Sequence, residues 1–167
     1  MDHQVKKTAL RMIPYGLFVL TAESPDGRVA AATVNWVTQC SFEPPLIVVG
    51  VKADSGVHGI IKEIRRFALN VLGKEQGGAA YAFFKATTRE GNALNGQAIR
   101  PGANGQPLVE GCPGYLECDL VDTVEQGDHS LFIGRITAAG ILAEPSGRPD
   151  DLTLLLKDLG EKVFYGG

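Results

Sequence analysis

The chain has 167 residues and a formal net charge of −3, and it contains no basic run of the kind that nucleic-acid binding leaves in a sequence. Apolar residues make up 44% and charged residues 21%, as in an ordinary globular protein, and no apolar run approaches the roughly 20 residues of a membrane span. The start lacks a signal peptide's apolar core, and the spacing of the three cysteines fits neither a zinc site nor a redox pair. We expect one domain over residues 1–167, in the cytoplasm, with free thiols and with no membrane or nucleic-acid partner.

The beginning of the chain predicts a hairpin. Residues 2–10 are polar with one apolar ridge, which suits a short helix or an arm, and Gly16–Thr21 predicts a buried strand. Ser24–Gly27 predicts a turn, because proline presets φ and glycine accepts a positive φ. The chain then returns as a long strand from Arg28, which ends at residues 42–45 because proline has no N–H to donate to a ladder.

The long strand has two different faces. Residues 30–46 read AAATVNWVTQCSFEPPL, and their period of two is typical of a half-buried strand. One face carries Thr33, Asn35, Gln39 and Ser41. The other carries Val34, Trp36, Cys40 and Phe42. A row of uncharged hydrogen-bonding groups suits a flat polar heterocycle that must be oriented.

A helix follows a further buried strand at Leu46–Val51. Its apolar residues recur at the spacing of one helical face, at Val57, Ile60, Ile61 and Ile64. Ser55 stands before it as the expected N-cap. Phe67–Leu72 then predicts a strand, and Glu75–Lys85 predicts a second, weaker helix.

The second half of the chain is less regular. Thr87–Gly111 is rich in Gly, Asn and Pro and predicts a long loop, either a functional lid or a disordered segment. Tyr115–Val124 and Ser130–Ala139 predict two strands, while the tail after Gly147 suits either a strand or a helical turn. Many glycines between short apolar runs indicate a mainly β fold with minor α, an antiparallel barrel capped by one or two helices.

The central stretch resembles a known signature. TVNWVTQCSFEPPL matches the T-x-N-x-x-T-x-x-S-x-x-P-P-L pattern of the flavin reductase-like family, the FMN-binding split barrels, at Thr33, Asn35, Thr38, Ser41, Pro44, Pro45 and Leu46. The resemblance continues at Phe67–Val71 and at Gly127-Asp128-His129, and so covers residues 10–140. It implies a split antiparallel β-barrel of Greek-key type, and a homodimer that covers the open sheet edges with flavin near the interface.

The resemblance also implies which residues would line the flavin. They are Thr33, Val34, Asn35, Gln39, Cys40 and Ser41 of the central strand, several of them through backbone groups. Trp36 is a further cofactor-binding candidate, although its place on the apolar face favours a core or dimer contact. From the residues alone, Cys40 is expected to be a buried structural thiol, because free cysteine behaves as a small hydrophobe.

The helix after Ser55 is a candidate phosphate site. Its free N–H groups and positive dipole end attract anions, and Lys52 could add a point charge. From the residues alone, Ser55 merely caps the helix and Lys52 is solvated; the resemblance favours the FMN phosphate, while the nearby Asp54 opposes it. His58, one turn into the helix, is expected to be an ordinary, partly exposed histidine.

His129 is the catalytic candidate. In the family that the motif resembles, the histidine of G-D-H faces the pyridine nucleotide, and an imidazole can hydrogen-bond or stack on nicotinamide near neutral pH. Phe84 and Lys85 are further flavin-binding candidates, with core packing as the alternative. No spacing predicts a metal site, and no GxGxxG follows a strand. NAD(P)H would therefore bind in the cleft over the flavin, with residues 91–105 as a lid.

These expectations describe an FMN-dependent oxidoreductase, with FAD as the alternative cofactor. NAD(P)H would give hydride to the flavin, which would reduce free flavin, an oxygenase partner or another acceptor. Three alternatives stay open: a flavoredoxin-like electron carrier with a protein partner, a non-catalytic barrel that binds flavin or haem, and a barrel without cofactor. The residues do not separate FMN from FAD, or NADH from NADPH.

Overall fold

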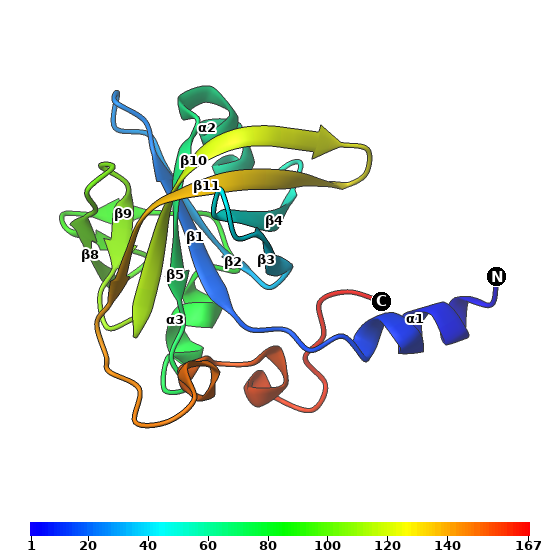
Figure 1. The fold of residues 1–167 in the computed structure, drawn as a ribbon. Helices are drawn as coiled ribbons and strands as arrows, with labels where there is room; N and C mark the ends of the chain where they lie inside the picture. Colours follow the sequence, from blue (N-terminus) through cyan, green and yellow to red (C-terminus); the bar gives the residue numbers. More distant parts are fainter.

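A seven-stranded antiparallel sheet forms the body of the computed structural model, which describes residues 1–167 (Figure 1). Its strands follow the order β2-β1-β5-β10-β11-β4-β3. Their bounds are β1 Phe18–Glu23, β2 Val29–Val34, β3 Val37–Ser41, β4 Leu46–Lys52, β5 Arg66–Val71, β10 Gly114–Glu125 and β11 His129–Ile141. Every pairing in this sheet is antiparallel, so the predicted mainly β, antiparallel class is confirmed. The ladder leaves β2 and β3 as its edges, and closure into a barrel stays a prediction.

The prediction of one long strand that begins at Arg28 and ends at residues 42–45 is wrong. The chain leaves β2 at Asn35 and Trp36, and β3 then pairs with β4 at the opposite edge of the sheet. The alternation of faces therefore does not continue from β2 into β3, and a register shift after Gln39 interrupts β3 itself. The break depends on distant partners, since the Asn35 amide donates to the Tyr165 carbonyl and the Gly50 N–H donates to the Trp36 carbonyl.

The predicted loop of residues 87–111 is a second antiparallel sheet. Its four short strands are β6 Arg89–Glu90, β7 Ala93–Leu94, β8 Gln97–Pro101 and β9 Pro107–Val109. Leu94, Ile99 and Leu108 are buried beneath it. The expectation of a loop or a disordered segment is therefore wrong, and a lid role for residues 91–105 stays a prediction. Strands of two to five residues are too short to show a period of two, and glycine turns separate them.

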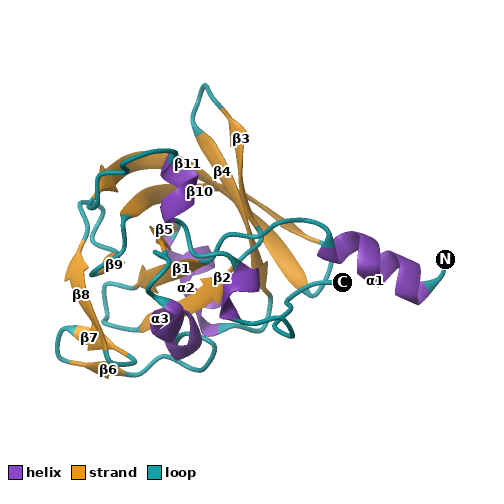
Figure 2. Cartoon of the chain, turned by 90° about the horizontal axis from the view of Figure 1, so that it is seen from below, coloured by secondary structure: helices purple, strands orange, loops and turns teal.

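Three α-helices accompany the sheets: α1 His3–Arg11, α2 Gly56–Ile64 and α3 Gly77–Ala82. Asp2 caps helix α1, because its carboxylate accepts from two backbone N–H groups, and the helix buries no residue. It projects from the body beside the C-terminus (Figures 1 and 2). Helix α2 confirms the predicted apolar face and the Ser55 N-cap, whereas α3 is shorter than predicted. None of these helices combines the length and the apolar character needed to cross a membrane.

The tail after Gly147 crosses the end of the sheet as two 3-10 turns, η1 Pro149–Leu152 and η2 Leu156–Leu159. Isolated bridges tie it to the body, from Thr153 to Gly73 and from Leu155 to Gly16. The tail therefore contains both of the alternatives that the sequence left open: the bridged residues Thr153–Leu155 are extended, and a helical turn lies on each side of them.

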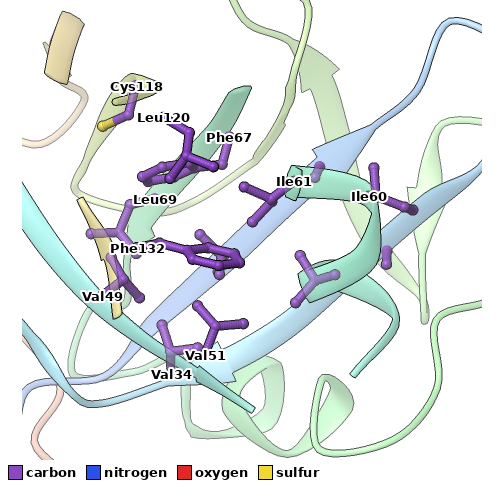
Figure 3. Close-up of a cluster of buried hydrophobic side chains, with 14 of the residues drawn as sticks. Val34, Val49, Val51, Ile60, Ile61, Phe67, Leu69, Cys118, Leu120 and Phe132 are labelled. Atoms are coloured by element: carbon purple, nitrogen blue, oxygen red, sulfur yellow. The ribbon is translucent and has the colours of Figure 1, made fainter. Parts of the chain in front are cut away.

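The protein has two hydrophobic cores, and each contains side chains of the seven-stranded sheet. Figure 3 shows the first, in which Phe132 and Leu69 of the sheet lie close to Ile61 of α2. The second core joins α3, the second sheet and the tail through Ala80, Leu94 and Leu154. The burial of Leu154 in this second core holds the tail against the body.

We predict that Gly134→Ala destabilises the first core. A Cβ on Gly134 would lie 2.5 Å from the Phe67 ring and 3.0 Å from the Cys118 Cβ, so the strands must shift, at a cost of about 1–3 kcal/mol. Gly59→Ala is the matched control, because Gly59 is exposed in α2 with nothing within 4 Å of an added Cβ. Alanine there should stabilise the protein by up to about 1 kcal/mol.

Urea unfolding midpoints measure both changes, which should have opposite signs. Equal midpoints for the two variants would contradict the close approach of Phe67 to β11.

Candidate functional site

A cavity of about 850 Å³ opens beside the edge strand β2. Three segments distant in sequence line it together with β2: the start of α2 with Lys52, the chain after α3, and the C-terminal tail. Most lining residues are apolar, with a few polar groups, which is the usual character of a small-molecule site.

The cavity gathers most of the cofactor-binding residues predicted from the sequence. These are Thr33, Val34, Asn35, Lys52, Ser55, Phe84 and Lys85. They come from β2, from the connection between β4 and α2, and from the end of α3, so it is the fold that brings them to one place. Their role toward a cofactor stays a prediction.

Two threonines fasten α3 and the chain that follows it to β2. The Thr33 hydroxyl donates to the Ala80 carbonyl at 2.7 Å. The Thr87 hydroxyl accepts from the Ala31 N–H at 2.8 Å and donates to the Ala31 carbonyl at 3.1 Å. Thr87 thus bonds the edge of β2 as a neighbouring strand would. The sequence analysis missed this residue because no local motif distinguishes it from other loop threonines.

The α2 end of the cavity is suited to an anion. Ser55 caps the helix, since its hydroxyl accepts from the His58 N–H and donates to the Lys52 carbonyl. The N–H groups of Gly56 and Val57, in the first turn, have no acceptor within the helix. The Lys52 ammonium lies 3.1 Å from the Asp54 carboxylate, and this hydrogen bond and charge raise the pKa of Lys52. Lys52 therefore stays cationic beside the helix end.

His129 lies behind this cavity in a hydrogen-bonded chain. Its Nδ1 lies 2.9 Å from the Asp128 carboxylate, and because a carboxylate only accepts, Nδ1 carries the proton. This bond lowers the pKa of Asp128. In the neutral imidazole, Nε2 then accepts from the Tyr165 hydroxyl at 2.7 Å, and burial raises the pKa of that phenol, which keeps it a donor. Tyr165 lines the cavity whereas His129 does not.

The remaining predicted residues lie outside the cavity lining: Trp36, Gln39, Cys40 and Ser41. The Trp36 ring packs against His129, with centroids 4.5 Å apart. Cys40 is exposed, so the expectation of a buried thiol is wrong: it lies on the edge strand β3, where the alternation that predicted burial is broken. The assignment of these residues to a cofactor stays a prediction.

His58 is buried, so the expectation of a partly exposed histidine is wrong. Its Nε2 lies 2.8 Å from the Ser130 hydroxyl, and its ring packs on Phe132 with centroids 4.9 Å apart. Strand β11, which a local pattern cannot place, carries both partners. Burial lowers the pKa of His58, and the charge of Lys62 lowers it further.

Comparison with known proteins gives one consistent result. A family model described as the flavin reductase like domain matches residues 10–159. The NADH-dependent flavin reductase StyB of Pseudomonas fluorescens is 30% identical over 140 residues, which cover 84% of this chain and 79% of StyB.

Solved structures agree in fold. The styrene monooxygenase flavin reductase of Pseudomonas putida S12 has a TM-score of 0.72 at 30% identity, covering 83% of this chain and 88% of that one. The NADH:FAD oxidoreductase SgcE6 of Streptomyces globisporus C-1027, in complex with NAD and FAD fragments, has a TM-score of 0.72 at 26% identity, covering 89% of this chain and 84% of that one.

We predict that His58 makes stability depend on pH. Its folded-state pKa lies below the ordinary 6.5, so unfolding takes up a proton below that pH. The contribution of neutral His58 to the free energy of unfolding is present above pH 6.5 and is lost as the pH falls below this value. His58→Gln should flatten the slope of unfolding free energy between about pH 5 and about pH 7. His3→Gln, at an exposed position in α1, is the control and should keep the slope. Equal slopes for the wild type and His58→Gln in urea titrations would contradict the burial effect.

Proposed function

The chain belongs to the flavin reductase-like family, and from this premise we propose that it is an NAD(P)H:flavin oxidoreductase with its flavin in the cavity beside β2. The observation that carries the proposal is the pairing of a mostly apolar cavity with a cationic helix N-terminus at one end. A flavin mononucleotide has the same two parts, a flat ring system and a phosphate.

The residues present fit such a group. The consecutive alanines Ala30–Ala32 leave room for a flat ring along β2, because a larger side chain there would fill the cavity. Beside Ala30, the N–H groups of Gly56 and Val57 and the Lys52 ammonium can hold a phosphate. A single anion site favours FMN as the resident flavin, with FAD as the alternative.

The flavin, once bound, supplies the redox chemistry by accepting hydride from NAD(P)H and passing electrons onward. The protein's part is to place the two reactants. We assign the nucleotide to the end of the cavity near Asn35 and His129, where the imidazole can orient a nicotinamide amide. Because StyB is named NADH-dependent and SgcE6 was solved with NAD fragments, NADH is the donor we propose.

An oxygenase is the electron acceptor that we propose, by way of reduced flavin. The relative from Pseudomonas putida S12 is the flavin reductase of a styrene monooxygenase. The edge of β3 has no neighbouring strand, so we also propose a homodimer, built from one domain per chain, in which the second copy covers this edge.

The visible spectrum under anaerobic conditions tests this function. Purified protein loaded with FMN should lose its flavin bands on addition of NADH, since hydride transfer needs no oxygen. Bands that persist with NADH and NADPH but bleach with dithionite would indicate an electron carrier or a storage protein instead. A protein that takes up neither FMN nor FAD would contradict the proposal as a whole.

His129→Ala sharpens the same experiment. The variant should keep its flavin, but NADH should bleach it at least about tenfold more slowly. This factor corresponds to the loss of one hydrogen bond to the nicotinamide. His3→Ala removes an exposed histidine from α1 and should bleach like the wild type. If His129→Ala bleaches at the wild-type rate, the role of His129 is wrong.

We predict that Lys52→Ala weakens FMN binding about tenfold, because it removes a charge-assisted hydrogen bond to the phosphate. Lys62→Ala is the matched control: it removes the same charge from α2, where Lys62 pairs with Glu125. Flavin fluorescence titration measures both. Riboflavin, which has no phosphate, should bind Lys52→Ala and wild type alike. An equal loss of FMN and riboflavin affinity would remove Lys52 from a phosphate site.

A further inference from the structure

The last residues of the chain close one end of the cavity. Val163, Phe164 and Tyr165 line it together with Lys52 and the start of α2. The terminus then runs back to lie beside α1, as Figures 1 and 2 both show, with the Arg11 guanidinium 4.1 Å above the Phe164 ring. We call residues 163–167 the C-terminal strap.

Tyr165 joins the strap to the residues assigned to the nucleotide. Its hydroxyl donates to His129 Nε2 at 2.7 Å, and its carbonyl accepts from the Asn35 amide at 3.2 Å. Its ring also lies 5.5 Å from the Trp36 ring and 5.8 Å from the His129 ring.

The hydroxyl of Tyr165 occupies the one nitrogen of His129 that a ligand could use. Nδ1 is already committed to Asp128, so Nε2 is the remaining hydrogen-bonding atom. The His129 side chain is only 13% exposed, and Tyr165 rather than His129 lines the cavity. A nicotinamide ring can therefore meet His129 only after Tyr165 has moved.

The strap is held in a way that permits this movement. No backbone–backbone hydrogen bond joins residues 164–167 to the rest of the chain, and Phe164 and Tyr165 are about half exposed. Gly166 covers the Trp36 indole, whose Nε1 is buried without a hydrogen-bond partner. A buried N–H without an acceptor costs free energy, which is recovered when the strap lifts and water reaches it.

We propose that the C-terminal strap competes with the pyridine nucleotide for His129, with Tyr165 occupying the nicotinamide position in the closed state. This inference rests on the proposed function. The closed strap lowers the apparent affinity for the nucleotide in proportion to the fraction of molecules in which it is closed. Tyr165 thereby sets the nucleotide concentration at which the protein works.

Two variants loosen the strap from different sides. Tyr165→Phe removes the hydrogen bond to His129 and keeps the ring. Arg11→Ala removes the cation above Phe164 and touches neither the cavity nor His129. Arg148→Ala is the matched control for charge, because Arg148 pairs with Asp150 in an exposed turn.

Trp36 supplies a readout that needs no turnover, since it is the only tryptophan of the chain and its ring contacts His129 and Tyr165. FMN-loaded protein is titrated with NAD⁺ while its emission is followed. Tyr165→Phe and Arg11→Ala should each bind NAD⁺ about three- to tenfold more tightly than wild type and Arg148→Ala. Before NAD⁺ is added, acrylamide should quench Trp36 more strongly in these two variants.

The possible outcomes of the NAD⁺ titration distinguish a failure of the strap proposal from a failure of the proposed function. If wild type binds NAD⁺ and both variants bind it equally or more weakly, Tyr165 does not compete and the strap proposal fails while the reductase stands. If Tyr165→Phe alone binds more weakly, Tyr165 is part of the nucleotide site, which also overturns the competition. If FMN-loaded wild type neither binds NAD⁺ nor bleaches with NADH or NADPH, the proposed function fails with it.

Discussion

The edge strand β2 pairs with one neighbouring strand, β1, and its other side is open. The site depends on which groups bond the N–H and C=O groups of that open side. On that side the Thr87 hydroxyl bonds both the N–H and the carbonyl of Ala31, and the Thr33 N–H donates to the Phe83 carbonyl, in place of a further strand. An edge strand with open N–H and C=O groups invites pairing with another chain. Here the same edge is fastened to the chain after α3, and the space between them becomes the cavity. A strand in that place would have filled the site.

The break in the strand at Asn35 and Trp36 brings the end of β2 into contact with His129 and the C-terminal tail. Because the chain leaves β2 there and continues in β3 at the opposite edge of the sheet, Asn35 meets the tail and Trp36 meets His129. A continuous strand would have kept these residues in a ladder. The site thus combines rigid elements, β2 and the start of α2, with a tail whose last residues make no backbone–backbone hydrogen bond to the rest of the chain.

The parts that the sequence predicted have local causes. The turn at Ser24–Gly27, the Ser55 cap and the apolar face of α2 follow from neighbouring residues, and the structure contains all three. The break in the long strand, the second sheet and the burial of His58 depend on distant partners, and local periodicity missed them. The family resemblance pointed to Thr33, Lys52 and Phe84, which the fold brings to one cavity. It gave no sign of Tyr165, because the contacts of Tyr165 arise from tertiary structure alone.

A crystal structure of the protein soaked with FMN tests the central claim most directly, because the claim concerns where the flavin lies. We predict density for the ring along β2, between Ser55 and Tyr165, with the phosphate within hydrogen-bond distance of the Gly56 and Val57 N–H groups. Flavin density on the exposed face of β3, or anywhere else outside this cavity, would contradict the account.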